Sequence, residues 1–386
     1  MRSCFLPFHQ PLIDEDDERA VLEVLRSGWI TTGPRTKGFE KTLAAYVGTT
    51  HAVGVNSCTA ALSLALEVVG VGPGDEVITS PITFASTANV IVHRGARPVF
   101  VDVEPTTLNI DADRIEAAIT PRTKAIIPVD FAGHPADLDD IMALARRRSL
   151  VVIEDAAHAI GAEYRGRRVG SVADMTAFSF YATKDITCGE GGALTTDNAA
   201  WAERIGIMAL HGISRDAWKR YSADGYQHWD IIYPGHKFNM FDLQGALVQS
   251  QLTKIDGFHA RRVALKARLD AGLRDLPEVG FPGEKPGIKH AYHLYPIIVR
   301  TEMLAADRDQ VMHAIQAENV GVGVHFRAVH LQPYYAETFG FLRGDFPHAE
   351  YYSDRTISLP LYPRMTDRDA DDVVEVMRAV IAEFRR

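Results

Sequence analysis

A lysine beside a glycine-rich segment is the first residue in this sequence that could perform chemistry. Lys184 closes the stretch Phe178–Lys184, which follows an apolar run, and the glycine-rich segment Gly189–Gly192 comes shortly after it. A lysine amine with a depressed pKa is a nucleophile that forms Schiff bases with carbonyl groups. Spacing alone equally allows a solvated surface lysine, so both interpretations stay open at this point.

An acidic residue and a histidine follow another apolar run. Asp155 and His158 lie just after Leu150–Ile153, so a carboxylate stands where a buried strand would end. A carboxylate shielded from water needs a cationic partner, or its pKa rises. The alternative is that Asp155 caps the following helix, and the residues by themselves leave the two roles equally open.

A third segment has the character of a phosphate site. Asn56–Ala60 lies between a predicted strand and a predicted helix, and Ser57 can cap that helix. The free N–H groups of a first helical turn suit a phosphate. Ordinary helix capping is the common alternative, because most strand-to-helix turns contain such a residue.

Together the three segments predict a binding site for pyridoxal 5'-phosphate. This cofactor needs a lysine for its aldehyde, a carboxylate for its pyridine nitrogen and a cradle for its phosphate. Asp155 would keep the pyridine nitrogen protonated, while Lys184 would serve both as covalent anchor and as the base that moves the proton. Phe84, after another predicted strand, offers an apolar plate for the ring, or else is a core phenylalanine.

Alternating strands and helices must position these residues. Buried strands are predicted at His51–Val55, Glu76–Thr79, Pro98–Val101, Lys124–Val129, Leu150–Glu154, Thr176–Phe180 and Ala193–Thr196. Helices are predicted between them at Ala60–Val69, Ala85–Arg94, Asp113–Ile119 and Leu138–Arg147, and before them at Glu15–Ser27 and Lys37–Val47. This alternation is typical of an α/β fold with a mainly parallel sheet flanked by helices. Ligands of such sheets bind beyond the carboxyl ends of the strands.

The pattern changes after about residue 240. A long helix is predicted over Asp242–Leu276, followed by a proline- and glycine-rich connection, Pro277–Gly287. Strands near Tyr292–Arg300 and Gly321–His325 and helices at Arg308–Glu318 and Asp367–Phe384 complete the chain. We therefore expect an N-terminal arm and a large domain over residues 1–245, and a smaller C-terminal α+β domain over 246–386.

Composition excludes several classes of protein. The 386 residues are 46% hydrophobic and 24% charged, which is ordinary for a globular chain and unlike a fibre or a disordered tail. A net charge of 41 − 50 = −9 argues against nucleic acid as the main partner. No apolar stretch reaches the roughly 18 residues of a membrane span.

The cysteines and the N-terminus bear on the cell compartment. Cys4, Cys58 and Cys188 are the only cysteines and contain no CxxC pair, so a structural zinc site or a disulfide framework is not expected. Met1–Gln10 has no secretory signal pattern. These features predict a reduced, cytoplasmic protein.

The sequence resembles the DegT-type (DegT/StrS) sugar aminotransferases, which have the fold-type-I aminotransferase architecture, from about Phe8 to Ala382. The segments that carry the resemblance are Ser27–Pro34, Asn56–Leu62, Glu154–Ala159 and Phe178–Lys184. The similarity is greatest to the branch that aminates C4 of UDP-linked 4-keto sugars. A related branch that dehydrates sugars has histidine in place of the lysine, and Lys184 argues against it.

The resemblance implies roles for individual residues. Lys184 matches the Schiff-base lysine, Asp155 the acid at the pyridine nitrogen, and His158 a side chain near the ring oxygen. Phosphate-side contacts are implied for Ser57, Cys58, Thr59 and Ser179, and ring stacking for Phe84. Asn239 matches a residue that reaches the phosphate from the neighbouring subunit. Sugar-side contacts are implied for Phe8, Trp29, Thr31, His325 and Arg327. Many relatives have Gly or Ala at the position of Cys58, so the role of its side chain stays open.

The resemblance also implies the reaction and the partners. The implied enzyme transfers the amino group of L-glutamate to C4 of a UDP- or dTDP-linked 4-keto-6-deoxyhexose in polysaccharide biosynthesis, as a homodimer with shared active sites. The alternatives are amination of a keto-cyclitol and a regulatory protein that binds pyridoxal phosphate without turnover. A nucleotide-binding oxidoreductase is disfavoured, because no GxGxxG motif follows a strand.

Overall fold

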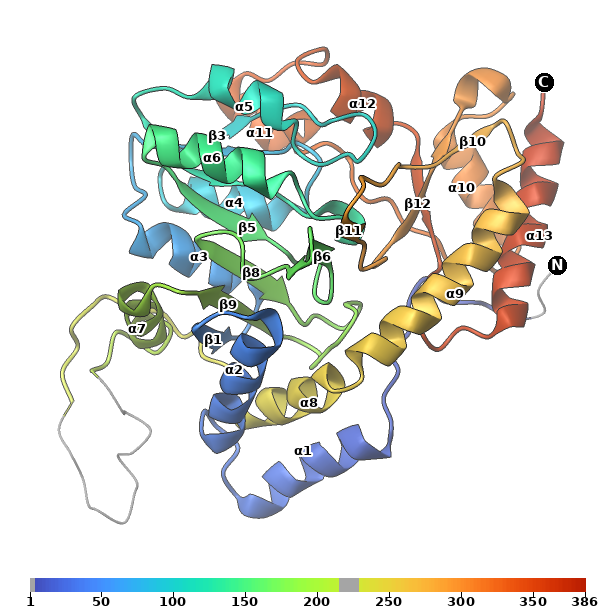
Figure 1. Ribbon diagram of the computed structural model, residues 1–386. Coiled ribbons are helices and arrows are strands. Elements are labelled where there is room, and N and C mark those ends of the chain that lie inside the picture. The colour runs from blue at the N-terminus through green and yellow to red at the C-terminus, as the bar shows by residue number, and fades with distance from the viewer. Residues whose placement is uncertain (1–3, 215–228) are drawn as a thin grey trace.

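A seven-stranded sheet forms the centre of the larger part of the molecule (Figure 1). The computed structural model describes residues 4–214 and 229–386. Across the sheet the order is β1-β9-β8-β5-β4-β2-β3. These strands span His51–Val55 (β1), Glu76–Thr79 (β2), Arg97–Phe100 (β3), Thr123–Ile127 (β4), Val151–Asp155 (β5), Met175–Ser179 (β8) and Gly192–Thr196 (β9). Strands β3, β2, β4, β5 and β8 run parallel, while β9 is antiparallel to both β8 and β1. The predicted mainly parallel α/β sheet is confirmed.

Helices cover both faces of this sheet. One face packs against α3 (Cys58–Val68), α4 (Ala85–His93) and α7 (Ala199–Met208). The other packs against α5 (Ala112–Ala118) and α6 (Leu138–Arg148), and against α2 (Pro34–Val47) and α8 (Asp242–Leu252). Alternate strand residues face opposite ways, so Ile153 lies in the first of these cores and Val152 in the second. Burial on both faces explains why the strands are continuous apolar runs.

The ends of the first two helices have clear local causes. Helix α1 spans Glu15–Ser27, as predicted, with Asp14 as N-cap in a capping box with Asp17 and Gly28 as a left-handed C-cap. Helix α2 begins at Pro34, three residues before the predicted start, because proline is well suited to the first helical position.

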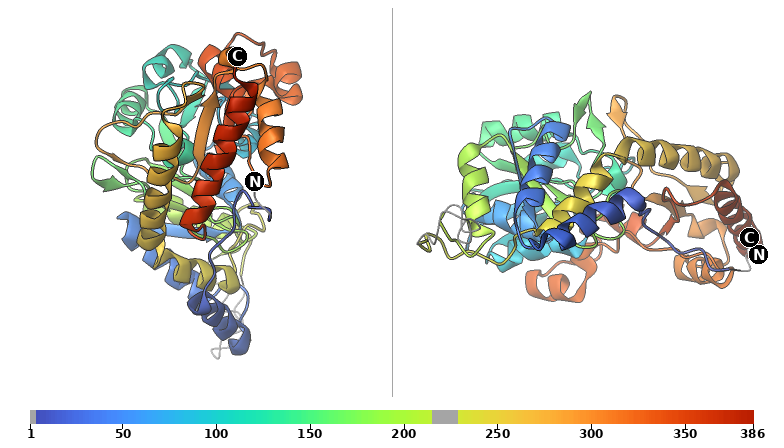
Figure 2. Two further views of the ribbon diagram at one scale, coloured as in Figure 1. Left: turned by 90° about the vertical axis from the view of Figure 1, so that its right-hand side faces the viewer. Right: turned by 90° about the horizontal axis from the view of Figure 1, so that it is seen from below.

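A second, three-stranded sheet lies in the C-terminal part, in the order β10-β12-β13. Its strands are Val279–Gly280 (β10), Tyr295–Val299 (β12) and Thr356–Leu359 (β13). Helices α9 (Ile255–Leu273), α10 (Arg308–Ala317) and α13 (Asp367–Phe384) build one core with it, and α9 and α13 lie side by side in both figures of the whole molecule (Figures 1 and 2). Leu6, from the N-terminal arm, is part of the same core. Short helices α11 (Pro333–Phe339) and α12 (Pro347–Ser353) lie before β13, and α12 contributes Tyr352 to a core shared with Ile82 after β2.

The single long helix predicted over Asp242–Leu276 is wrong. The chain forms α8 and α9 instead, with Thr253 and Lys254 between them, and α9 ends at Leu273. The break lies where the chain passes from one core to another, because Leu252 packs with α2 and Leu265 with the C-terminal sheet. At the break Lys254 pairs with Asp17 of α1 at 2.8 Å.

The strand predicted at Gly321–His325 is also wrong. Only Gly323 pairs there, in an isolated bridge with Ser358, while Val320 pairs with Leu6 of the N-terminal arm. The segment therefore changes partner within three residues and forms no ladder. Strand β13, which was not predicted, pairs with β12 in the three-stranded sheet instead.

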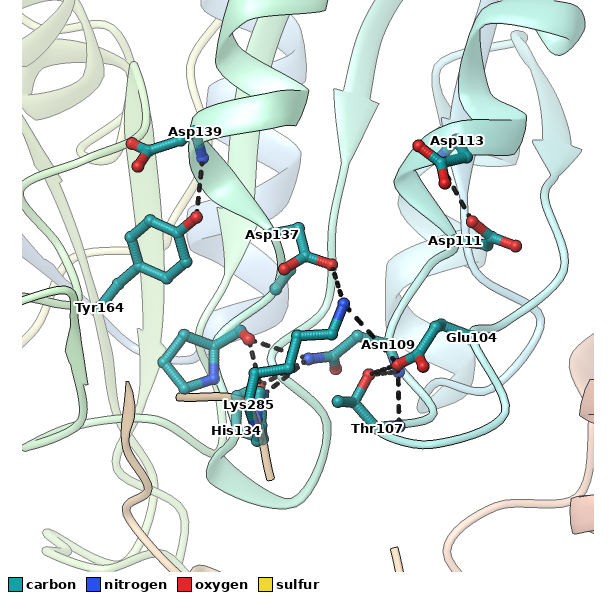
Figure 3. Close-up of polar contacts among 12 residues, drawn as sticks. Glu104, Thr107, Asn109, Asp111, Asp113, His134, Asp137, Asp139, Tyr164 and Lys285 are labelled. Atoms are coloured by element: carbon teal, nitrogen blue, oxygen red, sulfur yellow. Dashed lines mark hydrogen bonds and ion pairs between the residues drawn. The ribbon is translucent and has the colours of Figure 1, made fainter. Parts of the chain in front are cut away.

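The predicted proline- and glycine-rich connection is fastened to the loops of the large sheet (Figure 3). The Lys285 backbone N–H donates to His134 Nε2 at 3.1 Å, and its Nζ donates to Asp137 at 2.7 Å. Strand β11 (Ile288–Lys289) follows the connection directly and pairs with β6 (Glu163–Tyr164), which forms a hairpin with β7 (Arg167–Arg168). The division into domains at residue 245 stays a proposal; that residue lies inside α8.

Within the described ranges 4–214 and 229–386, no helix has both the length and the apolar character needed to cross a membrane.

Candidate active site

A cavity of about 740 Å³ lies beyond the carboxyl ends of β5 and β8, beside the start of α3. The following residues that the sequence singled out all line it: Phe8, Ser57, Cys58, Thr59, Phe84, Asp155, His158, Ser179, Lys184 and His325. The remaining four, Trp29, Thr31, Asn239 and Arg327, do not line it. The place is the one that the strand-end rule predicts for a parallel sheet.

Asp155 lies at the end of β5, with 4% of its surface exposed. Its Oδ2 accepts a hydrogen bond from Thr87 Oγ1 at 2.7 Å, and its Oδ1 accepts one from the Ala157 N–H at 3.2 Å. No helix follows directly, since the chain turns and enters β6, so the alternative of a helix-capping aspartate is wrong. Burial raises the pKa of Asp155, while these hydrogen bonds act in the opposite direction.

Thr87 is a site residue that the sequence analysis missed. It is fully buried in α4, and its hydroxyl lies 2.7 Å from that of Thr83. Since Thr87 donates to Asp155, Thr83 is the donor to Thr87, and the two hydroxyls fix one oxygen of the carboxylate. The available signal was a threonine within a predicted helix, three residues after Phe84.

Lys184 follows β8 and reaches the same cavity from the neighbouring strand. Within the described part of the chain, its amine has no hydrogen bond or ion pair. Burial lowers the pKa of Lys184, and the nearby Asp155 and Asp185 oppose that shift. A desolvated amine without a partner matches the requirement for a Schiff-base nucleophile, and the alternative of a solvated lysine does not fit this setting.

His158 is buried against the cavity and has an unused nitrogen. Its Nδ1 has no hydrogen-bond partner among the described residues, and burial lowers the pKa of the ring well below its usual value. Its ring lies 4.5 Å from that of His293 and is stacked 5.8 Å from that of Phe326. The ring lines the cavity, and a neutral imidazole offers one nitrogen that donates and one that accepts.

A buried ion pair lies next to Lys184 and also escaped the sequence analysis. The carboxylate of Asp185 is 2.9 Å from Arg262 Nη2, and both side chains are almost wholly buried. The same Asp185 Oδ1 lies 3.1 Å from Nδ1 of His293. The pair connects the segment after β8 to α9, and it holds the backbone that carries Lys184.

The start of α3 forms the part of the cavity suited to a phosphate. Ser57 caps the helix by accepting the Ala60 N–H at 3.1 Å, so the predicted capping is confirmed, and it also lines the cavity. Strand β9 approaches closely here, because a Cβ at Gly192 would stand 2.4 Å from the Cys58 nitrogen. Thr59 and Ser179 add hydroxyl groups on the same side.

Aromatic side chains form one wall of the cavity. Phe8 is stacked on His325, with 5.2 Å between the ring centroids, and Phe326 lies between His325 and Phe84. Phe84 is 62% exposed, so the alternative of a core phenylalanine is wrong. Arg327 is exposed just beyond Phe326 and outside the lining of the cavity.

Two other predicted residues gather at a separate hollow of about 370 Å³, lined by Ile30, Thr31, Asn56, Lys237, Asn239 and Phe241. Asn239 donates to Thr32 Oγ1 at 2.7 Å and accepts from Lys237. The hollow joins three segments that are far apart in the sequence. The nearby Trp29 indole donates to the Thr32 carbonyl at 3.2 Å. None of these side chains reaches the 740 Å³ cavity of its own chain.

The cavity residues fit pyridoxal phosphate. An amine without a partner in the described chain (Lys184), a buried carboxylate (Asp155) and a buried imidazole (His158) all line one cavity. The capped start of α3 supplies backbone N–H groups for a phosphate. These are the groups that the cofactor's aldehyde, ring nitrogen, ring oxygen and phosphate require.

Comparison with known proteins gives a consistent result. Residues 11–378 match the DegT/DnrJ/EryC1/StrS aminotransferase family. The spore coat polysaccharide biosynthesis protein SpsC of Bacillus subtilis (strain 168) is 49% identical over 381 residues, which cover 98% of either chain. The PMP form of Spr1654 from Streptococcus pneumoniae aligns with a TM-score of 0.91 at 34% identity, over 98% of this chain and 99% of that one. Helicobacter pylori PseC, an aminotransferase involved in the biosynthesis of pseudoaminic acid, aligns with a TM-score of 0.91 at 29% identity, over 98% and 100%.

Proposed function

This chain belongs to the DegT/DnrJ/EryC1/StrS aminotransferase family, and from that premise we propose that it moves the amino group of L-glutamate to C4 of a 4-keto-6-deoxyhexose linked to UDP or dTDP. It is a sugar aminotransferase that uses pyridoxal phosphate. The observation that carries the proposal is the Lys184 amine, which has no partner in the described chain and shares one cavity with the buried Asp155.

The residues of the cavity divide the work. When bound, pyridoxal phosphate supplies a ring that accepts electrons as a Cα–H bond breaks. Lys184 Nζ anchors the cofactor and carries the proton, since its lowered pKa lets it release as well as accept one. Asp155, held by Thr87, keeps a proton at the ring nitrogen. His158 orients the ring from its edge, and the start of α3 binds the phosphate.

The sugar side of the proposal rests on the aromatic wall and on resemblance. Phe8 and His325 stack in the lining of the cavity, and such faces suit the apolar side of a deoxysugar ring. Arg327 lies exposed just beyond them, where a bidentate contact with a diphosphate is possible. The similarity to SpsC, a spore coat polysaccharide biosynthesis protein, supports a nucleotide-linked sugar as acceptor. The choice of C4 depends on resemblance alone.

The acceptor can be identified with a panel of ketones. The enzyme, first converted to its aminated form with L-glutamate, is offered UDP- and dTDP-linked 4-keto-6-deoxyhexoses and scyllo-inosose, a keto-cyclitol without a diphosphate. We expect rapid return of the cofactor's aldehyde absorbance with a nucleotide sugar only, and ping-pong kinetics because donor and acceptor use one cavity in turn. Efficient amination of the cyclitol, with neither nucleotide sugar accepted, would contradict the proposed substrate. It would not contradict the assignment as an aminotransferase.

A homodimer with shared active sites is also part of the proposal. Asn239 and Thr31 line a hollow separate from their own chain's cavity, and Ile30 and Phe241 beside them are exposed apolar residues. In a two-fold dimer the same patch of each subunit faces the other. Asn239 would then serve the partner's cofactor phosphate, while Trp29 supports the segment that carries Thr31.

Mixing two inactive variants tests the shared site. If Asn239 acts in trans, a dimer of Lys184→Ala and Asn239→Ala subunits has one site with both lesions and one intact site. Random exchange should therefore restore about a quarter of wild-type activity, since half of the dimers are mixed and each has one working site of two. The matched control mixes Lys184→Ala with Asp155→Asn, which damage one cavity in cis and should restore nothing. No recovery in the first mixture after verified exchange contradicts shared sites.

A further inference from the structure

Two buried carboxyl groups, outside the reaction described above, lie behind Asp155. Asp130 follows β4 and Glu154 is on β5, and neither side chain has any exposed surface. Asp155 faces α3 and α4, through Cys58 and Thr87. Glu154 points the other way, because alternate strand residues face opposite sides of the sheet.

Each of the two groups has one satisfied oxygen and one without a donor. Asp130 Oδ1 accepts the Ala136 N–H at 2.9 Å, and Glu154 Oε2 accepts Thr176 Oγ1–H at 2.7 Å. Asp130 Oδ2 and Glu154 Oε1 are buried with no hydrogen-bond donor, while the two side chains are within hydrogen-bonding reach of each other. A hydrogen bond between two carboxyl groups requires a proton on one of them.

No cation balances the pair within the described chain. Neither side chain has an ion pair with a lysine, arginine or histidine there. The groups that face it are Thr176 on β8, the Gly170 N–H, the Ala136 N–H after β4, and the negative Asp155 next in the chain. Two negative charges in such surroundings repel strongly, so one carboxyl group keeps its proton.

We propose that Asp130 and Glu154 share one proton at neutral pH and so place a single fixed negative charge behind Asp155. The backbone couples the groups directly, since the Asp130 N–H donates to the Asp155 carbonyl at 3.1 Å. That charge favours every positive charge in the cavity, including the proton on the cofactor's ring nitrogen. Asp130 and Glu154 touch neither cofactor nor substrate and are positioning residues. Only this effect on the cofactor rests on the proposed function; the shared proton does not.

The stability of the holoenzyme tests the shared proton without reference to catalysis. In the unfolded chain both groups are ionised above about pH 5, so the native pair binds one more proton than the unfolded pair. Unfolding of the wild type then releases one proton that unfolding of Asp130→Asn does not. Between about pH 6 and pH 8, the ratio of the wild-type unfolding constant to that of Asp130→Asn should therefore rise about tenfold per pH unit. In that variant the amide N–H of residue 130 replaces the shared proton. Parallel profiles of the two proteins would overturn the proposal.

Absorbance titration of the bound cofactor tests the charge. Asp130→Asn and Glu154→Gln each keep one negative charge, and both should titrate as the wild type does. The double variant Asp130→Asn/Glu154→Gln removes the negative charge. It should lower the pKa observed for the bound cofactor by about one unit, which is a tenfold lower proton affinity. If the cofactor pKa shifts in each single variant and shifts twice as far in the double variant, both carboxylates are ionised in the wild type. If it shifts in no variant, the pair has no electrostatic effect on the cofactor. Either result overturns the proposal.

A measurement on the wild type remains decisive if a variant does not fold. The infrared spectrum of the holoenzyme at neutral pH should contain the carbonyl band of a protonated carboxylic acid, shifted in D₂O. In either single variant that folds, this contribution should disappear. Absence of any such band from the wild type overturns the shared proton.

Discussion

Replacing Lys184 with alanine is expected to abolish amino transfer, lowering kcat by about four orders of magnitude or more while leaving the fold intact. One amine serves as both the covalent anchor and the proton carrier, so its loss removes two functions together. The side chain makes no hydrogen bond or ion pair within the described chain, so its removal should cost little stability. Steady-state rates with saturating cofactor, beside circular dichroism and Tm, provide the measurement.

Two matched variants separate this role from a general need for positive charge. Lys184→Arg should be as inactive as Lys184→Ala, because a guanidinium stays protonated and cannot form the Schiff base. Lys289, which pairs with Glu163 at 3.4 Å outside the cavity, provides the control, and Lys289→Ala should keep full activity. Appreciable transamination by purified Lys184→Ala protein would show that Lys184 is not the anchor.

The second large effect is expected for Asp155→Asn, which should retain bound cofactor but lose about two to four orders of magnitude in rate. A neutral amide cannot hold the proton of the ring nitrogen, and the loss of an ion pair from a shielded site costs on the order of 3–5 kcal/mol. The amide keeps the shape of the carboxylate, and its one oxygen still accepts from either Thr87 or Ala157. Cofactor content by absorbance and single-turnover rates with L-glutamate separate binding from chemistry.

Asp111 offers a fair comparison, since it is an aspartate whose structural role is capping. It caps α5 by accepting the Asp113 N–H at 3.2 Å and does not line the cavity. Asp111→Asn should leave the rate unchanged. An Asp155→Asn protein within threefold of wild type would mean that the Asp155 charge contributes nothing to catalysis.

The sequence predicted the residues at strand ends well because their positions depend on local patterns. An apolar run followed by Glu154 and Asp155, and another that leads to Lys184, place Asp155 and Lys184 at the same edge of a parallel sheet. The predicted strands of the large sheet agree with the observed ones to within two residues. Burial on both faces makes these runs unmistakable.

The supporting residues could not be predicted in the same way. Thr87 is 68 positions from Asp155 in the chain, and His293 is 108 positions from Asp185. Such contacts depend on how α4 and the C-terminal segment pack against the sheet, and no local pattern encodes that packing. The break between α8 and α9 has the same origin, because helical periodicity continues across it while the packing partner changes.

The most direct measurement is the half-reaction with L-glutamate alone. Purified holoenzyme with no acceptor should form one 2-oxoglutarate per subunit and stop, with the cofactor converted to its aminated form, because the amino group has nowhere further to go. Lys184→Ala protein should form none. The absence of 2-oxoglutarate from wild-type holoenzyme with verified cofactor content would contradict an aminotransferase that uses glutamate.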